Sequence, residues 1–417
     1  MNKFLNAIHS DNRPVRIVKR GAIPWWKTGL LYLLSLIFAL AMGGIFILAI
    51  GKSPLSFYAK MFTGAFSNAI YIKLLLRSFV PLLVTSIGIS VAFKMKYWNI
   101  GAEGQFLIGS LCAASAAFLL GNSLPSWLTI IIILVAGAVG GGIYGVITAL
   151  FKVKWGTNET LLTLMFNYIA LYIIKYLVYV PFYKAPGNGI PTFKPIPEIG
   201  WLTTFKMGDV MVDTGFIIAI ALVFIVFVYF RFSKHGYELT VVGDSPNTAK
   251  YAGINVKKVI VRTMFLSSLI VGLAGAMQLT GSAAGHSLSS GLTSGVGWTG
   301  IIVAWLAKLN PFGIGVVAFL MAVLENGCEV ARAAMHISAA VADILQGIIL
   351  FSVLGFDFFI KFKLVFRKIE KKNSKTHISK GQDDGLDTGD GKEISAAVSL
   401  DSQVQIAEKA NEGVTAL

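Results

Sequence analysis

The chain has 417 residues, of which 55% are hydrophobic and only 14% are charged. This composition, with a mean hydropathy of +0.71, excludes a soluble globular domain and indicates a polytopic membrane protein. The formal net charge of +15 does not indicate nucleic-acid binding, because the basic residues flank apolar segments instead of forming one basic face. Both cysteines, Cys112 and Cys328, lie in apolar segments, which argues against a disulfide framework or a metal site.

The N-terminal segment 1–27 is basic and precedes a long apolar run at 29–50. Ala39-Leu40-Ala41 imitates a signal-peptidase site, but the polar region before it is too long and the apolar run continues past it. The pattern therefore predicts an uncleaved first membrane helix.

Nine more apolar segments follow, at 71–93, 102–120, 127–151, 161–180, 214–230, 259–280, 296–306, 312–331 and 339–359. Together with the first they predict an all-α, polytopic helix bundle of about ten transmembrane helices at 28–360. Gly137, Gly141 and Gly145 recur every four residues, and Gly272 and Gly275 come later, which predicts close helix packing.

Basic residues concentrate in alternate connecting segments, which include Lys94, Lys96, Lys152, Lys154, Arg231, Lys234, Lys250, Lys257, Lys258 and Lys308. The positive-inside rule then puts both termini and the 233–258 segment in the cytosol. The bias is weakest at the second span, where Lys73 and Arg77 fall near the outer end. The polar tail 361–417 has too little apolar content to fold alone, so we expect it to be cytosolic and largely disordered.

Two outer segments stand out. Segment 181–213 is long and rich in proline and glycine, which is typical of an ordered cap or docking loop, with a plain connector as the alternative. Segment 281–297 is small and polar and leads into a short apolar run that Asn310-Pro311 interrupts. Short or broken spans often lie beside a substrate path, because free backbone groups are tolerated only within protein or around a cavity.

The cytosolic segment 233–258 carries a compact helix signal. Ser245 is a good N-cap, Pro246 suits the first helical position, and Gly253 after Ala252 suits a left-handed end. The resulting helix, of about two turns, is too short to be stable alone. We expect the neighbouring spans or a partner protein to hold it.

Ionisable and amide side chains near the other spans have two interpretations. Glu103 and Glu159, with Asn158, either cap helix N-termini or form a polar ring at the mouth of a pathway. Glu325, Glu329, Asn326 and Asp343 either join helices or line a path for a polar solute. Asn167, Gln278 and Trp298 suit a neutral solute with an aromatic base but are equally ordinary as packing residues.

No nucleophile–base arrangement, metal-ligand spacing or nucleotide site emerges from the sequence. Gly51-Lys52-Ser53 resembles the end of a phosphate-binding loop but lacks its first glycine. We therefore expect no catalytic residue and no cofactor in this chain.

Three motifs together resemble a known family. They are 98–105 (WNIGAEGQ), 156–162 (GTNETLL) and 243–254 (GDSPNTAKYAGI), and they look like the inner-membrane permeases of ABC importers for simple sugars and nucleosides. That family also includes branched-chain amino acid permeases, and the resemblance covers about 26–360. The Asn-Glu-Thr-Leu form and the proline-rich outer loop are most similar to the bacterial nucleoside subgroup.

The resemblance implies a plasma-membrane transport subunit with several partners. These are an ATPase subunit that holds ATP and magnesium, a second and often different permease, and an extracellular substrate-binding lipoprotein. The 245–252 helix becomes the coupling helix, with Gly243 and Gly253 setting the turns before and after it. The implied coupling residues are Gly243, Asp244, Ser245, Pro246, Ala249, Ala252 and Gly253, and the candidate pathway residues are Glu103, Asn158, Glu159, Asn167, Gln278, Trp298, Glu325, Asn326 and Asp343.

Three alternatives stay open at this point. A sugar importer shares the same motifs. A secondary transporter could use Glu325, Glu329 or Asp343 as its ion site. The third is a membrane-embedded enzyme or assembly factor, against which the lack of a catalytic constellation argues.

Overall fold

The computed structural model describes residues 15–19, 25–187, 189–281, 285–338, 340, 344–345, 347–348, 351–352, 355 and 362–366. The chain divides into two units, one formed by Met1–Arg16 with Val365–Leu417 and the other by Ile17–Leu364. The second unit contains the membrane helices and every site discussed below.

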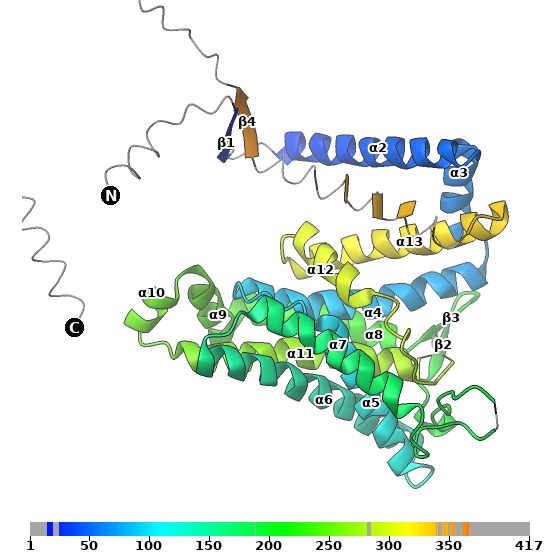
Figure 1. Ribbon diagram of the computed structural model, residues 1–417, viewed down its shortest axis with the longest axis vertical. Helices are drawn as coiled ribbons and strands as arrows, with labels where there is room; N and C mark the ends of the chain where they lie inside the picture. The colour runs from blue at the N-terminus through cyan, green and yellow to red at the C-terminus, as the bar shows by residue number, and fades with distance from the viewer. Residues whose placement is uncertain are drawn as a thin grey trace, which may run out of the picture. The chain divides into compact units, whose positions relative to one another are not determined.

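The described part of the chain is dominated by helices (Figure 1). In chain order they are α2 (Trp25–Ala49), α3 (Pro54–Ala65), α4 (Ala69–Lys94), α5 (Ala102–Leu120), α6 (Ser126–Trp155), α7 (Glu159–Leu177), the 3₁₀ helix η1 (Glu198–Gly200), α8 (Gly215–Phe232), α9 (Lys234–Asp244), α10 (Pro246–Tyr251), α11 (Val256–Thr280), α12 (Val296–Leu306) and α13 (Pro311–Met335). Strands β2 (Thr204–Met207) and β3 (Val210–Asp213) form an antiparallel hairpin, and β1 (Val15–Lys19) pairs with β4 (Phe362–Phe366).

Seven described helices are long and apolar enough to cross a membrane, namely α4, α5, α6, α7, α8, α11 and α13. The end of α2 and α3 form a pair bent by 118°, which adds an eighth span if the pair counts as one. Helix α12 has 11 residues and rises about 16 Å, well short of a hydrocarbon core of about 30 Å. The expected span 339–359 lies mostly outside the described residues, so the helix bundle is confirmed while the count of about ten stays a prediction.

Helix α11 packs against α4, α5 and α6 to form the core of the bundle. Glycines make this packing possible, because a Cβ atom on Gly272 would lie 2.5 Å from the carbonyl oxygen of Gly137 and 2.8 Å from the Cα of Gly141. A Cβ atom on Gly109 of α5 would likewise lie 2.5 Å from the Cα of Gly272. The close packing predicted from the glycine spacing is therefore confirmed.

The two ends of the bundle differ (Figure 1). Helices α9 and α10 lie at one end, and the β2–β3 hairpin lies at the other. The 181–213 segment is tied down at the hairpin end, since Ile196 N–H donates to the His286 carbonyl at 2.8 Å and Leu202 N–H donates to the Thr280 carbonyl at 3.0 Å. These bonds favour an ordered cap over a plain connector.

Candidate functional site

The short helix α10 forms as its sequence predicts. Ser245 is the N-cap and accepts a hydrogen bond from Thr248 N–H at 3.2 Å, and Pro246 occupies the first turn. At the other end Gly253 is left-handed, with φ +75°. Its N–H donates to the Lys250 carbonyl, and Ile254 N–H donates to the Ala249 carbonyl. This pair of bonds is a Schellman motif, so both ends of the six-residue helix are capped.

Two of the predicted coupling residues face inward. Ala249 is fully buried in an apolar cluster with Leu239 of α9 and Val259 of α11. Gly243 does not set a turn before α10, because it lies inside α9, a helix that the sequence analysis did not anticipate. A Cβ atom there would lie 2.8 Å from the Lys94 carbonyl oxygen, so this glycine lets α9 approach the end of α4. Both residues therefore lie on the side of the α9–α10 pair that packs against the membrane helices.

Ion pairs fix α9 to the membrane helices. Arg262 of α11 donates to Glu238 of α9 at 2.7 Å, and this hydrogen bond holds the pKa of the Glu238 carboxyl below its ordinary value. Lys96, just after α4, lies 3.2 Å from Asp244 with both side chains exposed. The exposed Lys96–Asp244 pair adds little to the stability of the fold. The partly buried Glu238–Arg262 pair is stronger and joins α9 to α11, the central helix of the bundle.

The outer face of α10 is open and carries a large aromatic side chain. Tyr251 is 93% exposed, and Pro246, Asn247 and Lys250 are exposed beside it. An exposed tyrosine on a rigid, doubly capped support has the character of an anchor for a protein partner. Asp244, Ala252 and Gly253 are also exposed, while Ser245 is half-buried.

The first sequence motif, 98–105, forms a buried polar network with residues of α7 that directly follow the second motif. Asn99 and Gln105 exchange two hydrogen bonds, of 3.0 and 3.1 Å. Ile100 N–H donates to Thr163 Oγ1 at 3.1 Å. Asn99, Gln105 and Thr163 are fully or almost fully buried, so the network satisfies polar groups that could not be left unpaired inside a membrane protein.

Asn167 of α7 completes this network. Its Oδ1 accepts from Gly104 N–H at 2.8 Å, and its Nδ2 donates to the Ile100 carbonyl at 2.8 Å. One amide therefore satisfies a free N–H in the first turn of α5 and a carbonyl in the turn before it. These bonds support the packing interpretation of Asn167, and a contact with the solute stays a prediction.

Glu103 caps a helix other than its own. Its Oε2 accepts from Gly297 N–H in the first turn of α12 at 2.8 Å, and Thr293 also hydrogen-bonds the carboxyl group. The N-cap of α12, Gly295, has no side chain to do this. A carboxylate at a helix N-terminus is favoured by the helix dipole, so Glu103 fixes the start of α12 from α5.

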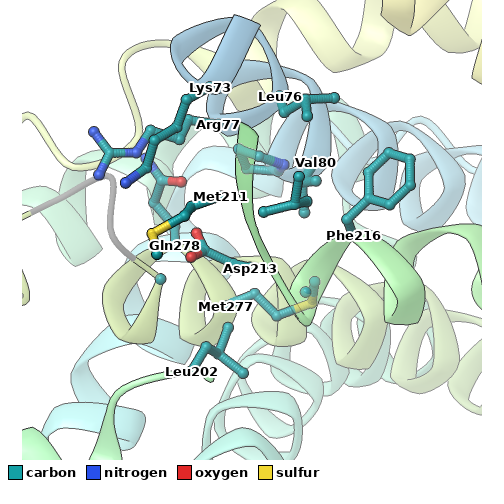
Figure 2. A pocket seen from close by; sticks show the side chains of 14 residues that line it. Lys73, Leu76, Arg77, Val80, Leu202, Met211, Asp213, Phe216, Met277 and Gln278 are labelled. Carbon is teal, nitrogen blue, oxygen red and sulfur yellow. The ribbon is translucent and has the colours of Figure 1, made fainter. Parts of the chain in front are cut away.

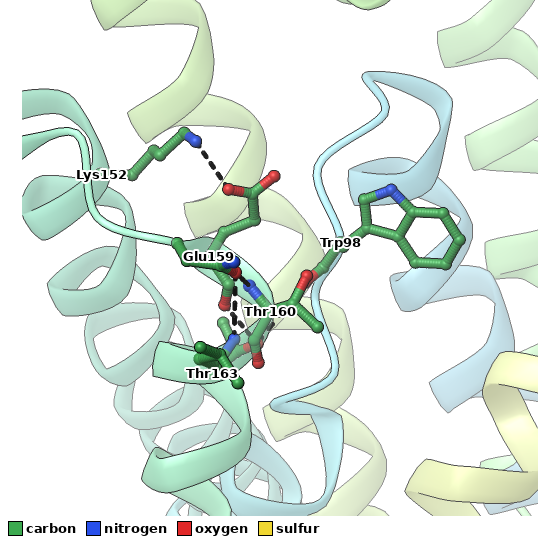
Figure 3. A network of polar contacts seen from close by, with 7 residues as sticks. Trp98, Lys152, Glu159, Thr160 and Thr163 are labelled. Atoms are coloured by element: carbon green, nitrogen blue, oxygen red, sulfur yellow. Dashed lines mark hydrogen bonds and ion pairs between the residues drawn. The ribbon is translucent and has the colours of Figure 1, made fainter.

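Asn158 and Glu159 lie at the start of α7, and Figure 3 shows Glu159 beside Lys152. Asn158 is the N-cap and accepts from Thr160 N–H at 3.0 Å and from Leu161 N–H at 3.3 Å. Glu159 accepts from Lys152 Nζ at 2.6 Å, which joins α7 to the end of α6. Capping and ion pairing account for both side chains.

Other predicted pathway residues gather around Arg77, nearer the hairpin end of the bundle. A cavity of about 180 Å³ is lined by Leu74, Arg77, Ser78, Pro81, Gln278, Ser294, Val296, Glu325 and Asn326. A smaller cavity of about 30 Å³ shares Arg77 and Gln278 and reaches Asp213 of the hairpin, as Figure 2 shows. Ser294 precedes α12 and Val296 is its first residue, so this short helix begins beside the cavity.

Arg77 was not among the predicted pathway residues. The available signal was a cation inside an apolar helix, which is costly unless it faces protein or water. Arg77 lies 17 residues before Lys94, or roughly 26 Å along α4, so the cavity is far from the end that carries α10. Arg77 and Asp213 attract each other electrostatically across the cavity wall.

The remaining predicted residues lie elsewhere. Trp298 is 43% exposed on α12 and does not line either cavity. Glu329 pairs with Arg332, three residues later on the same helix. Asp343 lies outside the described residues. Among the residues that are described, no group of three His, Cys, Asp or Glu side chains could hold a metal ion.

Comparison with known proteins gives a consistent result. The family model described as branched-chain amino acid transport system / permease component matches residues 71–354. The guanosine ABC transporter permease protein NupP of Bacillus subtilis (strain 168) is 28% identical over 82% of this chain and 97% of its own length. The nucleoside ABC transporter permease protein NupB of Lactococcus lactis subsp. cremoris (strain MG1363) is 29% identical over 71% of this chain and 82% of its own length. The glucose ABC transporter permease protein TsgB13 of Haloferax volcanii is 25% identical over 85% of this chain and 94% of its own length.

Proposed function

The chain belongs to the branched-chain amino acid transport system permease family, and from this premise we propose that it is the membrane-spanning subunit of an ATP-driven nucleoside importer. The observation that carries the proposal is the doubly capped helix α10, presented with Tyr251 exposed at one end of a multi-pass bundle in the cell membrane. The names of the two nucleoside permeases among its relatives support the choice of solute.

In this proposal α9 and α10 receive the motion of a separate ATPase subunit. The exposed face with Tyr251 and Lys250 docks on that subunit, which holds ATP and magnesium. The buried face, with Ala249, passes the motion to α4 and α11. ATP binding shifts the transporter between two conformations only if the ATPase contacts differ between them, and α10 is where those contacts are made.

The solute enters at the opposite end of the bundle. An extracellular lipoprotein delivers it to the cap formed by 181–213, and it passes the cavity around Arg77, Gln278 and Asn326. Amide and guanidinium groups suit the hydroxyl and base oxygen atoms of a nucleoside. The cavity of about 180 Å³ is smaller than a typical ligand pocket of roughly 300–1,000 Å³, so the path needs either an opened conformation or a contribution from a second permease.

The proposal also includes the membrane arrangement. Both termini, the 1–27 segment and the 361–417 tail lie in the cytosol, the 28–360 region is the permease domain of about ten spans, and 233–258 is its coupling loop. A second, homologous permease completes the pathway. No role in nucleic-acid binding is proposed.

A simple-sugar importer is the alternative solute class, because the glucose permease from Haloferax volcanii matches over a similar length. An ion-coupled transporter is less well supported, since Glu329 is already paired with Arg332 and the family match points to ABC permeases.

The test is uptake into liposomes that contain the permease, its second permease and the ATPase, with the lipoprotein outside. Guanosine, uridine, ribose and glucose are compared with internal ATP and with a non-hydrolysable ATP analogue. The proposal predicts ATP-dependent uptake of the nucleosides. Uptake of the free sugars alone would select the alternative solute, and uptake driven by a proton or sodium gradient without ATP would reject the ABC mechanism.

A further inference from the structure

A groove runs between α6 and α11 at the end of the bundle that carries α9 and α10. Its volume is about 640 Å³, and it is open to the surface. Its lining residues are Val146, Val153, Asn255, Lys257, Lys258, Val261, Arg262 and Phe265. It is separate from the cavities around Arg77, and the proposed transport mechanism does not use it.

The groove is basic at one end and apolar at the other. The two helices are antiparallel, so Lys257 and Lys258 at the start of α11 lie level with the end of α6. Seven residues further along each helix, roughly 10 Å deeper, the walls are Val146 and Phe265. The Phe265 ring closes this deep end against α6, because a Cβ atom on Gly142 would lie 2.8 Å from the ring.

The basic end lies at the level of a membrane interface. Trp155 ends α6 and is exposed, and Lys154 Nζ lies 5.1 Å from the centre of its ring. Tryptophan and lysine at a helix end mark the headgroup region of a bilayer. Below them on α6, Ile147 and Leu150 are exposed apolar side chains suited to hydrocarbon. The groove therefore descends from headgroup level into the acyl region.

The cations of the groove have capacity for an anion. Lys257 and Lys258 form no ion pair with any residue that the structure describes. Arg262 uses Nη2 for Glu238, while its buried Nε has no hydrogen-bond partner among the described groups. Among the described residues, no carboxylate lines the groove itself. The result is an excess of positive charge next to an apolar slot.

We propose that this groove binds an anionic phospholipid of the surrounding leaflet. The phosphate lies between Lys257, Lys258 and Arg262, and one acyl chain follows Val146 and Phe265 into the bilayer. Basic pockets between membrane helices on the cytosolic side are typical sites for anionic headgroups. Because Arg262 also holds Glu238, the lipid site adjoins the attachment of α9 to the bundle.

The test measures lipid binding to the delipidated, full-length permease complex by native mass spectrometry, with phosphatidylglycerol and phosphatidylcholine of identical acyl chains. It needs neither ATP nor solute, so its outcome is independent of the proposed function. The test variant is the double substitution Lys257→Gln with Lys258→Gln. Its control is Lys184→Gln with Lys206→Gln, which removes the same charge from the 181–213 segment. A second test variant, Val146→Trp, fills the apolar end without changing charge.

The proposal predicts that phosphatidylglycerol binds more tightly than phosphatidylcholine, and that the double lysine variant weakens its binding by a factor of roughly 10 to 30, based on about 1 kcal/mol for each basic residue. The control keeps wild-type affinity, Val146→Trp loses affinity, and inorganic phosphate at equal concentration does not displace the lipid. Equal affinity for the two lipids, or equal effects of the test and control lysine variants, would overturn it. Cross-linking of Lys258→Cys to the second permease in native membranes would also overturn it, because the groove would then be a subunit interface.

Discussion

Replacing Asn167 should lower the stability of the helix bundle, because its side-chain amide satisfies two buried backbone groups. Asn167→Leu keeps a similar side-chain size but removes the hydrogen bonds to Gly104 N–H and the Ile100 carbonyl, both 2.8 Å long. Leaving a buried polar group unpaired costs about 1–3 kcal/mol, so the two groups together give about 2–6 kcal/mol. Hydrogen bonds within membrane proteins average about 0.6 kcal/mol, so the expected loss lies towards the lower end, at about 2–3 kcal/mol.

The assay is unfolding of the purified chain in mixed micelles of increasing denaturing detergent. Tyr168→Leu is the matched control, because Tyr168 is the next residue on α7 and is 50% exposed. We expect the control to change the free energy of unfolding by less than about 0.5 kcal/mol. If Asn167→Leu is as stable as the control, the buried network is not what holds the start of α5.

Three further predictions concern packing, the ion pair and the cap. Gly272→Ala places a Cβ atom 2.5 Å from the Gly137 carbonyl oxygen. We expect this clash to lower the free energy of unfolding by about 1–3 kcal/mol, seen as a lower thermal midpoint of the purified chain. An unchanged midpoint would contradict the close packing. Glu238→Gln should be less stable than wild type at neutral pH, because Arg262 lowers the pKa of Glu238 and the resulting stabilisation is present above the unfolded-state pKa. As the pH falls through the lowered pKa, wild type should lose this advantage and the two thermal midpoints should converge; a constant difference would refute the assignment. Gly253→Ala forces a side chain into a backbone with φ +75° and should weaken the cap of α10 by about 1 kcal/mol, seen as faster amide hydrogen exchange there and not elsewhere.

Local sequence signals predicted the elements that depend on local chemistry. Ser245, Pro246 and Gly253 fix α10 through caps that involve only neighbouring residues, and all three behave as expected. The glycine repeat predicted the close helix packing for a similar reason, since only a missing side chain permits such an approach. Length and hydropathy correctly predicted the seven described helices that could cross a membrane.

Features that depend on contacts between distant parts of the chain were predicted less accurately. Helix α9 was missed because its apolar content is low and it contains two glycines, Gly236 and Gly243, and because contacts with Arg262 and with the end of α4 hold it in place. Glu103 was expected either to cap a helix N-terminus or to line a path; it caps α12 through Gly297, which is 194 residues away and could not be identified from the sequence. Asn167 had both a solute-binding and a packing interpretation, and its hydrogen bonds to backbone groups of α5 support the packing interpretation. The sequence indicates that such polar groups need partners but not which partners they find.

The cavity around Arg77 illustrates the same limit. Gln278, Glu325 and Asn326 were recognised as polar residues in apolar helices, and the fold brings them together. Arg77 entered the sequence analysis only as an exception to the charge bias, because a single chain pattern does not indicate that α4, α11 and α13 converge on one space. The tertiary structure supplies that convergence.

The central claim is that α10 docks on the ATPase through Tyr251, and ATPase retention tests it most directly. The complex carrying Tyr251→Ala is compared with one carrying Tyr179→Ala, which removes a tyrosine that is 66% exposed near the 181–213 cap. Loss of an anchor residue typically costs 2 kcal/mol or more, so the affinity for the ATPase should fall by at least about thirtyfold, while the control keeps wild-type affinity. Wild-type affinity for the ATPase in Tyr251→Ala would contradict the account.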